Sequence, residues 1–321
     1  MIITYLDQNN SIQRSNNYIL DQSTKWIDLF CSTKEEAALI EKFLGINIPD
    51  QDEMSQIEIS ERLYVEGKTL YITIVQLVTL ESSFPETHAV TFILHEDRLI
   101  TVRYNEFKAF AVFNNKLCKN TLECKYTAHE IFFALLRNFV GILSDTLEYI
   151  SVEIDSYGRK VFNNDIQSNH RFNYAEILKK IGQQGDLLSK SRESLISLTK
   201  AINYALKFPT FNQDKDSALV LETLSNDITS NIDFAQFTSG EVIFILDATL
   251  GMIAIEQNNI IKIFSMVSIF FLPPTLIASI YGMNFSIMPE LKLPYGYPMA
   301  IIAMLLSIYI TYKYFKKKKW F

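Results

Sequence analysis

Residues 263–284 read IFSMVSIFFLPPTLIASIYGMN, and this stretch decides how the rest of the chain is interpreted. From Ile263 to Tyr281 no residue carries a charge. As a helix this run would span about 29 Å, which matches the hydrocarbon core of a bilayer. A second uncharged run extends from Leu293 to Tyr312 and is followed by Lys313 and the block Lys316–Lys319. The sequence therefore predicts two membrane spans at the C-terminal end of the chain.

The distribution of charge beside the two spans predicts their orientation. The tail is strongly basic, whereas the connection from Gly282 to Tyr297 carries only Glu290 and Lys292. Lysines and arginines beside a span favour the cytoplasmic side, so we expect the tail there and, with two spans, the N-terminal region as well. The first residues, MIITYLDQNN, show no signal peptide. We expect a multi-pass protein of the inner (plasma) membrane with both termini in the cytoplasm.

Composition and motifs argue against catalysis. The chain has 321 residues, a net charge of −6 and only ten glycines. It contains no Gly-rich phosphate loop, no G-x-S-x-G and no H-E-x-x-H. Cys31, Cys118 and Cys124 lack C-x-x-C spacing, and the four histidines form no ligand pair. We therefore expect no enzymatic activity, no organic cofactor and no nucleic-acid partner.

Residues 1–125 mix strand and helix patterns and predict a cytoplasmic α/β regulatory domain. Together with the helices that follow, this domain gives an expected fold class of α+β for the cytoplasmic part of the chain. Alternating apolar and polar residues rich in Ile, Val, Thr and Tyr indicate strands. The expected strands are Ile2–Leu6, Trp26–Phe30, Ile57–Val65, Thr69–Val78, His88–Leu94, Leu99–Tyr104 and Ala109–Phe113. One helix is expected at Thr33–Leu44, with Ser32 and Glu35 as a capping box.

Residues 126–259 predict a stalk of long helices. Apolar residues recur at spacings of three and four in residues 127–162 and again from Tyr174 to Leu206. These helices are joined around Asn163–His170, and the second ends before Pro209. A third helix runs from Asp216 to Tyr281, about 100 Å if continuous. A helix of that length needs neighbours along its whole length, which suggests a stalk shared among several copies of the chain.

One face of this third helix is small or polar for most of its length. Steps of three and four residues give Asp247, Gly251, Ala254, Asn258, Ile261, Ser265, Ser268, Leu272, Thr275, Ser279 and Gly282. We call this set the polar stripe. Identical helices with this repeat could keep the stripe on a common axis. Small residues also allow close helix packing in lipid, so the stripe alone indicates either a hydrated pore or a packing surface. Pro273 and Pro274 inside the span favour the pore modestly, because the carbonyls that they free must face protein or water.

The end of the stripe resembles the CorA family of magnesium transport proteins. The residues that carry the resemblance are Tyr281-Gly282-Met283-Asn284-Phe285 and Met288-Pro289-Glu290-Leu291, placed between two spans and before a basic tail. The resemblance is close from about Asp247 to Phe321. It implies a funnel-shaped homopentamer in a lipid bilayer. Residues 260–281 would be the pore-lining membrane helix, 282–296 the extracytoplasmic GMN/MPEL loop, 297–314 the second span and 315–321 a cytoplasmic tail.

The resemblance also implies roles for individual residues. Gly282, Met283 and Asn284 would form the selectivity filter, with five Asn284 amides at the outer mouth. The residues that would line the pore are Asn258, Ile261, Ser265, Ser268, Leu272, Thr275 and Ser279. Neutral amide oxygens suit hydrated Mg²⁺, because this ion loses its water reluctantly and a neutral ring releases it again. Co²⁺ and Ni²⁺ are possible further cargo.

Regulation is implied as negative feedback, in which cytoplasmic Mg²⁺ bound between subunits holds the pore closed. Asp247 matches an acidic position of the family on the stalk. Glu222 and Asp227 are candidates for the metal site, with plain surface acids as the alternative. Many members carry an acid two residues after the asparagine, whereas this chain has Ser286, which leaves Glu290 as the nearest acid in the loop.

Three alternatives remain open from the sequence. A zinc transporter of the same superfamily also carries the GMN tripeptide. A membrane-anchored metal sensor without transport would share the architecture. A tethered cytoplasmic enzyme is disfavoured, because residues 1–260 contain no catalytic constellation.

Overall fold

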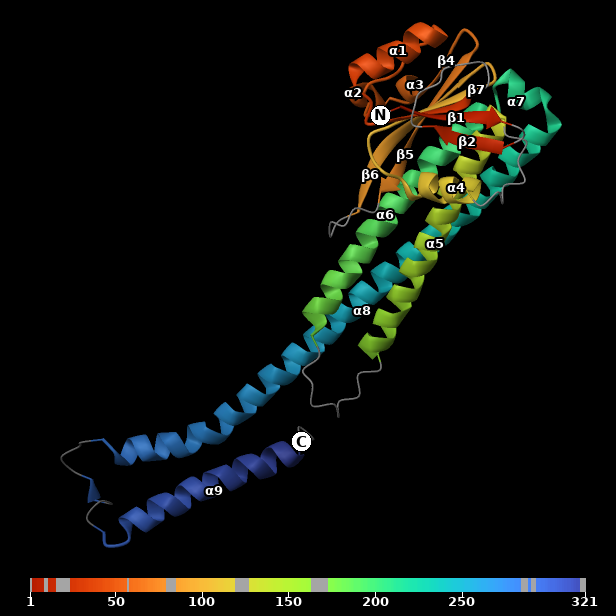
Figure 1. The fold of residues 1–321 in the computed structure, drawn as a ribbon. Coiled ribbons are helices and arrows are strands. Elements are labelled where there is room, and N and C mark those ends of the chain that lie inside the picture. Colours follow the sequence, from red (N-terminus) through yellow and green to blue (C-terminus); the bar gives the residue numbers. More distant parts are fainter. Residues whose placement is uncertain are drawn as a thin grey trace. The chain divides into compact units, whose positions relative to one another are not determined.

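A computed structural model of the chain describes residues 2–8, 11–15, 24–56, 58–78, 85–118, 127–162, 173–283, 288–289 and 293–317. The chain divides into two compact units, residues 1–247 and 248–321. Helix α8 (Lys215–Tyr281) is continuous and belongs partly to each unit (Figure 1).

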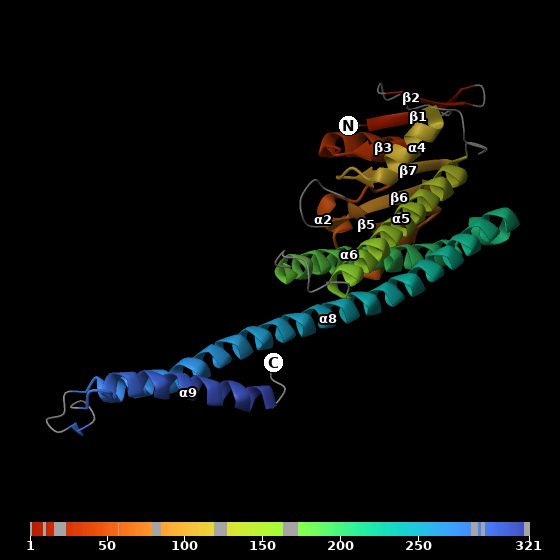
Figure 2. The same ribbon diagram turned by 90° about the horizontal axis from the view of Figure 1, so that it is seen from below.

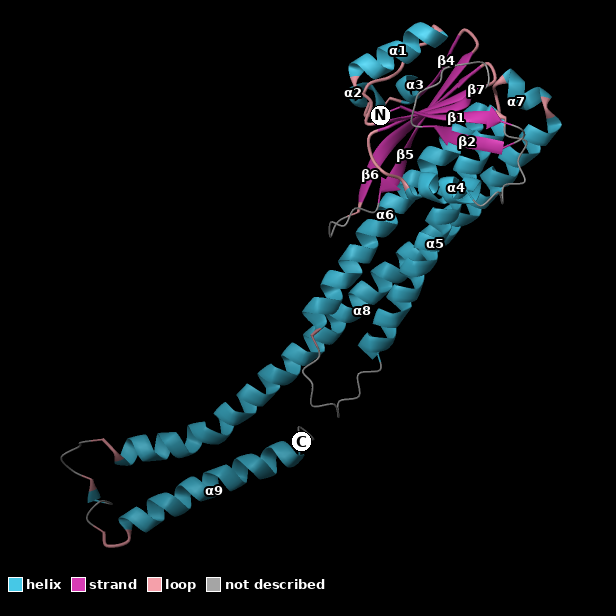
Figure 3. Cartoon of the chain, viewed as in Figure 1, coloured by secondary structure: helices cyan, strands magenta, loops and turns pink. Residues whose placement is uncertain are grey.

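The described strands of the first unit form one mixed sheet (Figure 3). Their order is β2-β1-β3-β7-β6-β5-β4, and β3 and β7 are its parallel pair. The bounds are β1 (Ile2–Gln8), β2 (Ser11–Ser15), β3 (Thr24–Phe30), β4 (Leu63–Glu66), β5 (Thr69–Val78), β6 (Glu86–His95) and β7 (Arg98–Arg103). Side chains alternate along each strand, so Ile72 and Phe92 share one face of the sheet while Tyr71 and Ile93 share the other.

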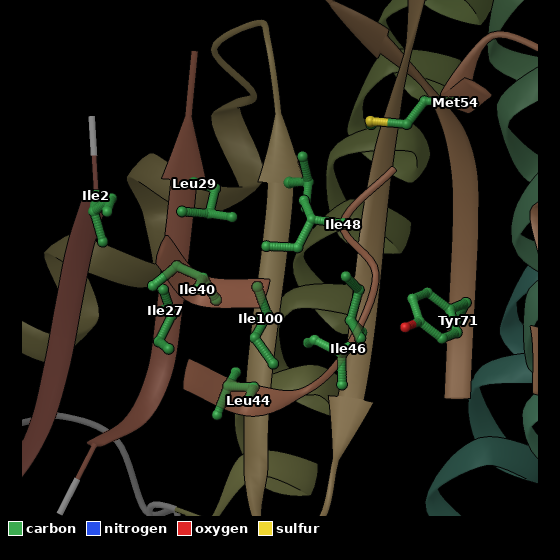
Figure 4. Close-up of a cluster of buried hydrophobic side chains, with 12 residues drawn as sticks. Ile2, Ile27, Leu29, Ile40, Leu44, Ile46, Ile48, Met54, Tyr71 and Ile100 are labelled. Carbon is green, nitrogen blue, oxygen red and sulfur yellow. The ribbon is translucent and has the colours of Figure 1, made fainter. Parts of the chain in front are cut away.

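Helices α1 (Lys34–Leu44) and α2 (Gln51–Met54) pack against the face that carries Tyr71. Figure 4 shows this core, in which Ile40 and Leu44 of α1 and Met54 of α2 lie against sheet residues such as Ile27. These side chains are all buried. The short helix α3 (Ile59–Arg62) leads directly into β4.

Further helices pack against the opposite face. They are α4 (Lys108–Cys118), α5 (Ala128–Phe162) and α6 (Tyr174–Ala205). The short helix α7 (Pro209–Gln213) packs against α5, where Phe211 meets the rings of Phe132 and Phe133. Phe92 meets the rings of Phe132 and Phe139 of α5 edge-on, at centroid distances of 5.3 and 6.4 Å. The backbone N–H of Val75 donates to the hydroxyl of Ser197 at 2.9 Å, which fixes α6 against β5.

Within the first unit, the N-terminal part of α8 packs against α5 and α6. The amide of Asn231 donates to the hydroxyl of Ser144 at 2.7 Å. Gly158 of α5 lies so close to α8 that an added Cβ would be 2.9 Å from Cδ1 of Ile245. The buried apolar positions of this part of α8 are Leu221, Leu224, Ile228, Ala235 and Ile245. The first four are separated by three, four and seven residues, and these spacings place them on one apolar face of the helix.

Several expectations from the sequence are confirmed. Thr69–Val78 forms β5 as expected, α6 ends at Ala205 before Pro209 starts the next helix, and the third long helix is continuous to Tyr281. The expected junction at Asn163–His170 lies outside the described residues.

Two expected strands are wrong wholly or in part. Ala109–Phe113 belongs to helix α4, where Ala109, Phe110 and Phe113 are buried together at helical spacing. Five apolar residues fit either period, and the surrounding residues extend the helical one. In the expected strand Ile57–Val65, residues 59–62 form α3 and the strand begins at Leu63, while Ile57 lies outside the described residues.

The capping box of α1 is displaced by one residue from the expected pair of Ser32 and Glu35. The N-cap is Thr33, whose hydroxyl accepts from the N–H of Glu36 at 3.2 Å. The Glu36 carboxylate accepts from the N–H of Thr33 at 3.0 Å. Both registers match the sequence pattern, and the observed one brings Ile40 and Leu44 onto the sheet.

Candidate functional site: the polar stripe of α8

The second unit contains the membrane candidates. Among the described residues, α8 and α9 (Gly296–Lys317) are long and apolar enough to cross a membrane, by length and composition. Figures 1 and 2 both show α9 running alongside the end of α8 within this unit. Large apolar side chains of both helices are exposed, as a lipid environment requires.

Every pore-lining candidate of the polar stripe is exposed in the single chain. The seven are Asn258, Ile261, Ser265, Ser268, Leu272, Thr275 and Ser279. Even the bulky members are uncovered, with Ile261 61% and Leu272 66% exposed. The chain by itself therefore leaves the whole stripe open to water, lipid or a second copy.

The opposite face of the same segment is half-buried. Met266, Phe270, Pro273 and Ile277 repeat at spacings of four and three, two residues out of phase with Ser268, Leu272 and Thr275. Two residues turn a helix by about 200°, so this set faces away from the stripe. The half-buried residues of α9, which are Gly296, Ala300, Met304, Ser307, Thr311 and Phe315, also repeat at spacings of four and three. The face of α8 opposite the stripe is therefore the less exposed one, and the stripe itself is exposed in the single chain.

A shallow groove of about 460 Å³ runs along the stripe in the span. The hydroxyl of Ser268 donates to the carbonyl of Phe264 at 3.0 Å, and that of Thr275 donates to the carbonyl of Phe271 at 2.6 Å. Because each hydroxyl proton is used within the helix, the oxygen presents lone pairs outward. Such oxygens can accept hydrogen bonds from the water shell of a cation.

The groove also includes two residues that the stripe does not contain. Phe271 and Leu276 line it together with Ser268, Leu272, Thr275 and Ser279. Both lie three or four residues from stripe members, so a wider helical window would have found them.

Pro273 and Pro274 lie inside α8 without ending it. Neither residue has an N–H to donate to the preceding turn, so the carbonyl of Ile269 has no such donor from Pro273. Both prolines are half-buried in the single chain.

The GMN turn is described only as far as Met283. The N–H of Gly282 donates to the carbonyl of Ala278 at 2.9 Å, and that of Met283 to Ile280 at 3.3 Å. A Cβ at Gly282 would lie 3.2 Å from the Ala278 carbonyl oxygen, which explains glycine at the helix end. Asn284 and Glu290 lie outside the described residues.

The acidic residues that are candidates for a regulatory metal site lie at separate positions along α8 and do not form a cluster. Glu222, Asp227 and Asp247 are each exposed. The described residues contain no cluster of three or more His, Cys, Asp or Glu side chains able to hold a metal. Elsewhere on the helix, burial and the nearby Asp155 of α5 raise the pKa of the Glu241 carboxyl. The three candidates are therefore exposed to a neighbouring copy, and the part of the chain that the structure describes does not bring them together into a metal site.

Comparisons with known proteins agree with this arrangement. The profile of the family described as "CorA-like Mg2+ transporter protein" matches residues 21–317. The magnesium transport protein CorA of Wolinella succinogenes is 33% identical over 299 residues, which cover 92% of this chain and 90% of that protein. The solved CorA magnesium transporter of Methanocaldococcus jannaschii has a TM-score of 0.78 at 20% identity, covering 100% of this chain and 99% of that one.

A more distant structural similarity is to the cytoplasmic domain of ZntB from Vibrio parahaemolyticus, with a TM-score of 0.53, 13% identity, and coverage of 78% of this chain and 97% of that one. That likeness concerns the fold alone, whereas the family profile spans nearly the whole sequence, both membrane candidates included. The chain therefore belongs to the CorA family of Mg²⁺ transporters.

Proposed function

We propose that five copies of this chain assemble into a channel that carries Mg²⁺, and also Co²⁺ and Ni²⁺, into the cytoplasm. The polar stripes of five α8 helices line the pore. The observation that carries this proposal is the uncovered stripe opposite the half-buried face of the same helix. Symmetric closure of identical helices would bring the five stripes to one axis.

Selectivity is assigned to the turn Gly282-Met283-Asn284 at the outer mouth. Ser265, Ser268, Thr275 and Ser279 then contact the hydration shell of the ion, with lone pairs that accept from its water. No carboxylate lies on the stripe between Asp247 and Asn284, so the dication is bound weakly enough to move on. Membrane voltage assists entry by about 4.6 kcal/mol for two charges across 100 mV.

The proposed gate responds to cytoplasmic Mg²⁺. Glu222, Asp227 and Asp247 of α8 are exposed, so each could share a metal ion with an adjacent subunit. Residues 1–125 act as the regulatory domain and 126–259 as the stalk. The basic tail keeps both termini in the cytoplasm of a cell whose inner membrane holds the protein. The chemistry is transport, and no catalytic step is assigned.

The test is Mg²⁺ uptake into proteoliposomes at several internal Mg²⁺ concentrations. We expect uptake that falls as internal Mg²⁺ rises and that Asn284→Ala abolishes. Asn212→Ala, at an exposed position of α7, is the matched control and should transport normally. Uptake indifferent to Asn284 would contradict the proposal. Entry of Zn²⁺ without Mg²⁺ would favour the zinc transporter instead.

A further inference from the structure

Two neighbouring cavities of about 420 and 240 Å³ lie in the first unit, far in sequence from the polar stripe. Arg62, Val75 and Glu193 line both of them, so together they form one depression, here called the Arg62 cleft. It lies beyond Ile72, the last residue of β5 that pairs with β4, where α6 contacts β5 through the bond from Val75 to Ser197. The cleft is thus a product of the sheet edge and one face of α6.

The charge around the Arg62 cleft is unbalanced. Arg62, Arg192 and Lys200 line it, and Glu193 is the one carboxylate among the described lining residues. Glu193 also accepts from Lys190 at 3.4 Å and from the hydroxyl of Thr87 at 3.3 Å. One carboxylate therefore lies among three lining cations and is also contacted by Lys190 from outside the lining, in a chain whose net charge is −6.

The three cations that line the cleft differ in their hydrogen-bond and ion-pair partners. Arg62 is half-buried, its Nε donates to the carbonyl of Gln56, and burial lowers the pKa of its guanidinium. Arg192 and Lys200 have no ion-pair partner within the described residues. A buried or crowded cation is stabilised by an anion that binds beside it. The cleft therefore favours an anionic ligand.

The walls indicate the kind of anion. Leu63, Val75 and Ile196 supply apolar surface beside the cations, and the hydroxyl of Ser189 adds a polar group. A volume of about 420 Å³ lies within the usual range of small-molecule sites, roughly 300–1,000 Å³. Arginine and lysine side chains bind phosphate through charge-assisted hydrogen bonds.

We propose that the Arg62 cleft binds a phosphate-bearing small molecule of nucleotide size, with its phosphates on Arg62, Arg192 and Lys200 and its apolar part along Val75 and Ile196. Recognition here would use side chains of a strand edge and a helix. It does not require the Gly-rich backbone loop whose absence led the sequence to predict no organic ligand.

The test is equilibrium binding of ATP to the full-length protein in lipid nanodiscs, with free Mg²⁺ held constant because ATP chelates it. The test variant is Arg192→Gln/Lys200→Gln, which changes two exposed positions and should fold normally. Lys179→Gln/Lys207→Gln removes the same charge from exposed positions that do not line the cleft and serves as the control. We expect ATP affinity to fall at least about tenfold in the test variant, because two charge-assisted contacts are lost. The control should change affinity less than about twofold.

Tripolyphosphate and adenosine distinguish the sources of the phosphate. Tighter binding of ATP than of tripolyphosphate would support a nucleotide, and equal binding would support an inorganic polyphosphate at the same cations. Absence of both ATP and tripolyphosphate binding, equal loss in the two double variants, or binding of adenosine as tight as that of ATP would overturn the proposal.

Discussion

The hydroxyl of Thr275 donates to the carbonyl oxygen of Phe271, 2.6 Å away, and so turns its lone pairs toward the groove on α8. In a pentamer, five such oxygens would accept from the waters of one hydrated ion. Thr275→Val keeps the shape but removes the acceptor. We expect Mg²⁺ flux to fall about fivefold, as for a loss of about 1 kcal/mol at the barrier, while Thr275→Ser retains flux.

The matched control for this change lies on α9. Thr311 makes the same kind of bond, to the carbonyl of Ser307 at 2.9 Å, but belongs to a half-buried face of that helix. Thr311→Val should leave flux near the wild-type value. Equal loss in both valine variants would mean that the hydroxyls matter for helix packing and not for the ion.

Leu272 is the large apolar residue of the stripe between Ser265 and Ser279 and is 66% exposed in the single chain. Five copies at one level of a pore would form an apolar constriction, which resists wetting. We expect Leu272→Ser to raise Mg²⁺ flux and to weaken inhibition by internal Mg²⁺. Leu305→Ser on α9 controls for a polar group in the membrane, and a Leu272→Ser protein with lower flux would contradict the constriction.

The stripe could be predicted from the sequence because it depends only on helical period. Once Ser265, Ser268 and Thr275 lie on one continuous helix, their common face follows from 3.6 residues per turn. Which face of α8 is half-buried in the folded chain could not be predicted, since burial depends on tertiary packing that the helical period does not specify. The Arg62 cleft could not be predicted either, because it brings Arg62 of α3 beside Glu193 of α6, which lies 131 positions later in the sequence.

In the sheet domain, predictability followed the length of each pattern. The ten residues of β5 are rich in Ile, Val, Thr and Tyr and indicate a strand clearly, whereas the five residues of Ala109–Phe113 fit the period of a strand and that of a helix, so the strand expected there is wrong. Strand β2 was not expected at all, because Ser11–Ser15 is polar and short and is defined by pairing with β1. Pairing of that kind is a tertiary property.

Asp28 and Arg103 form a buried ion pair between β3 and β7. Nη2 of Arg103 donates to Oδ2 of Asp28 at 2.8 Å, and the hydroxyl of Thr101 donates to Oδ1 at 2.7 Å. The guanidinium carbon also lies 4.3 and 4.5 Å from the rings of Phe30 and Phe110. Arg103→Met leaves a buried carboxylate without its cation, which costs about 3–5 kcal/mol.

We expect Arg103→Met to lower the melting temperature of the first unit by at least about 6 °C. The double variant Asp28→Asn/Arg103→Met should recover part of this loss, because no unpaired charge remains. Thermal unfolding followed by circular dichroism of the wild type, Asp28→Asn, Arg103→Met and the double variant gives the coupling free energy between Asp28 and Arg103. A double variant less stable than Arg103→Met would show that packing around Arg103 matters more than charge.

His129 predicts a dependence of stability on pH. Its ring meets Phe211 edge-on at 4.9 Å, and burial lowers its pKa against the opposing effect of Asp97, Asp214 and Glu130. As pH falls through the unfolded pKa near 6.5, the unfolded chain binds a proton that the folded protein still excludes, so stability falls.

Melting temperatures of the wild type and of His129→Gln, measured from pH 7.5 to pH 5.5, isolate this effect from the other titrating groups. We expect the wild type to lose more stability than His129→Gln over this interval. His88→Gln is the control, because His88 is only half-buried and its ring lies 3.2 Å from the carboxylate of Glu86 and not against a phenylalanine. If the wild type and His129→Gln lose stability equally, the imidazole of His129 accepts its proton as readily in the folded chain as in the unfolded one, and the contact with Phe211 does not exclude the charged ring.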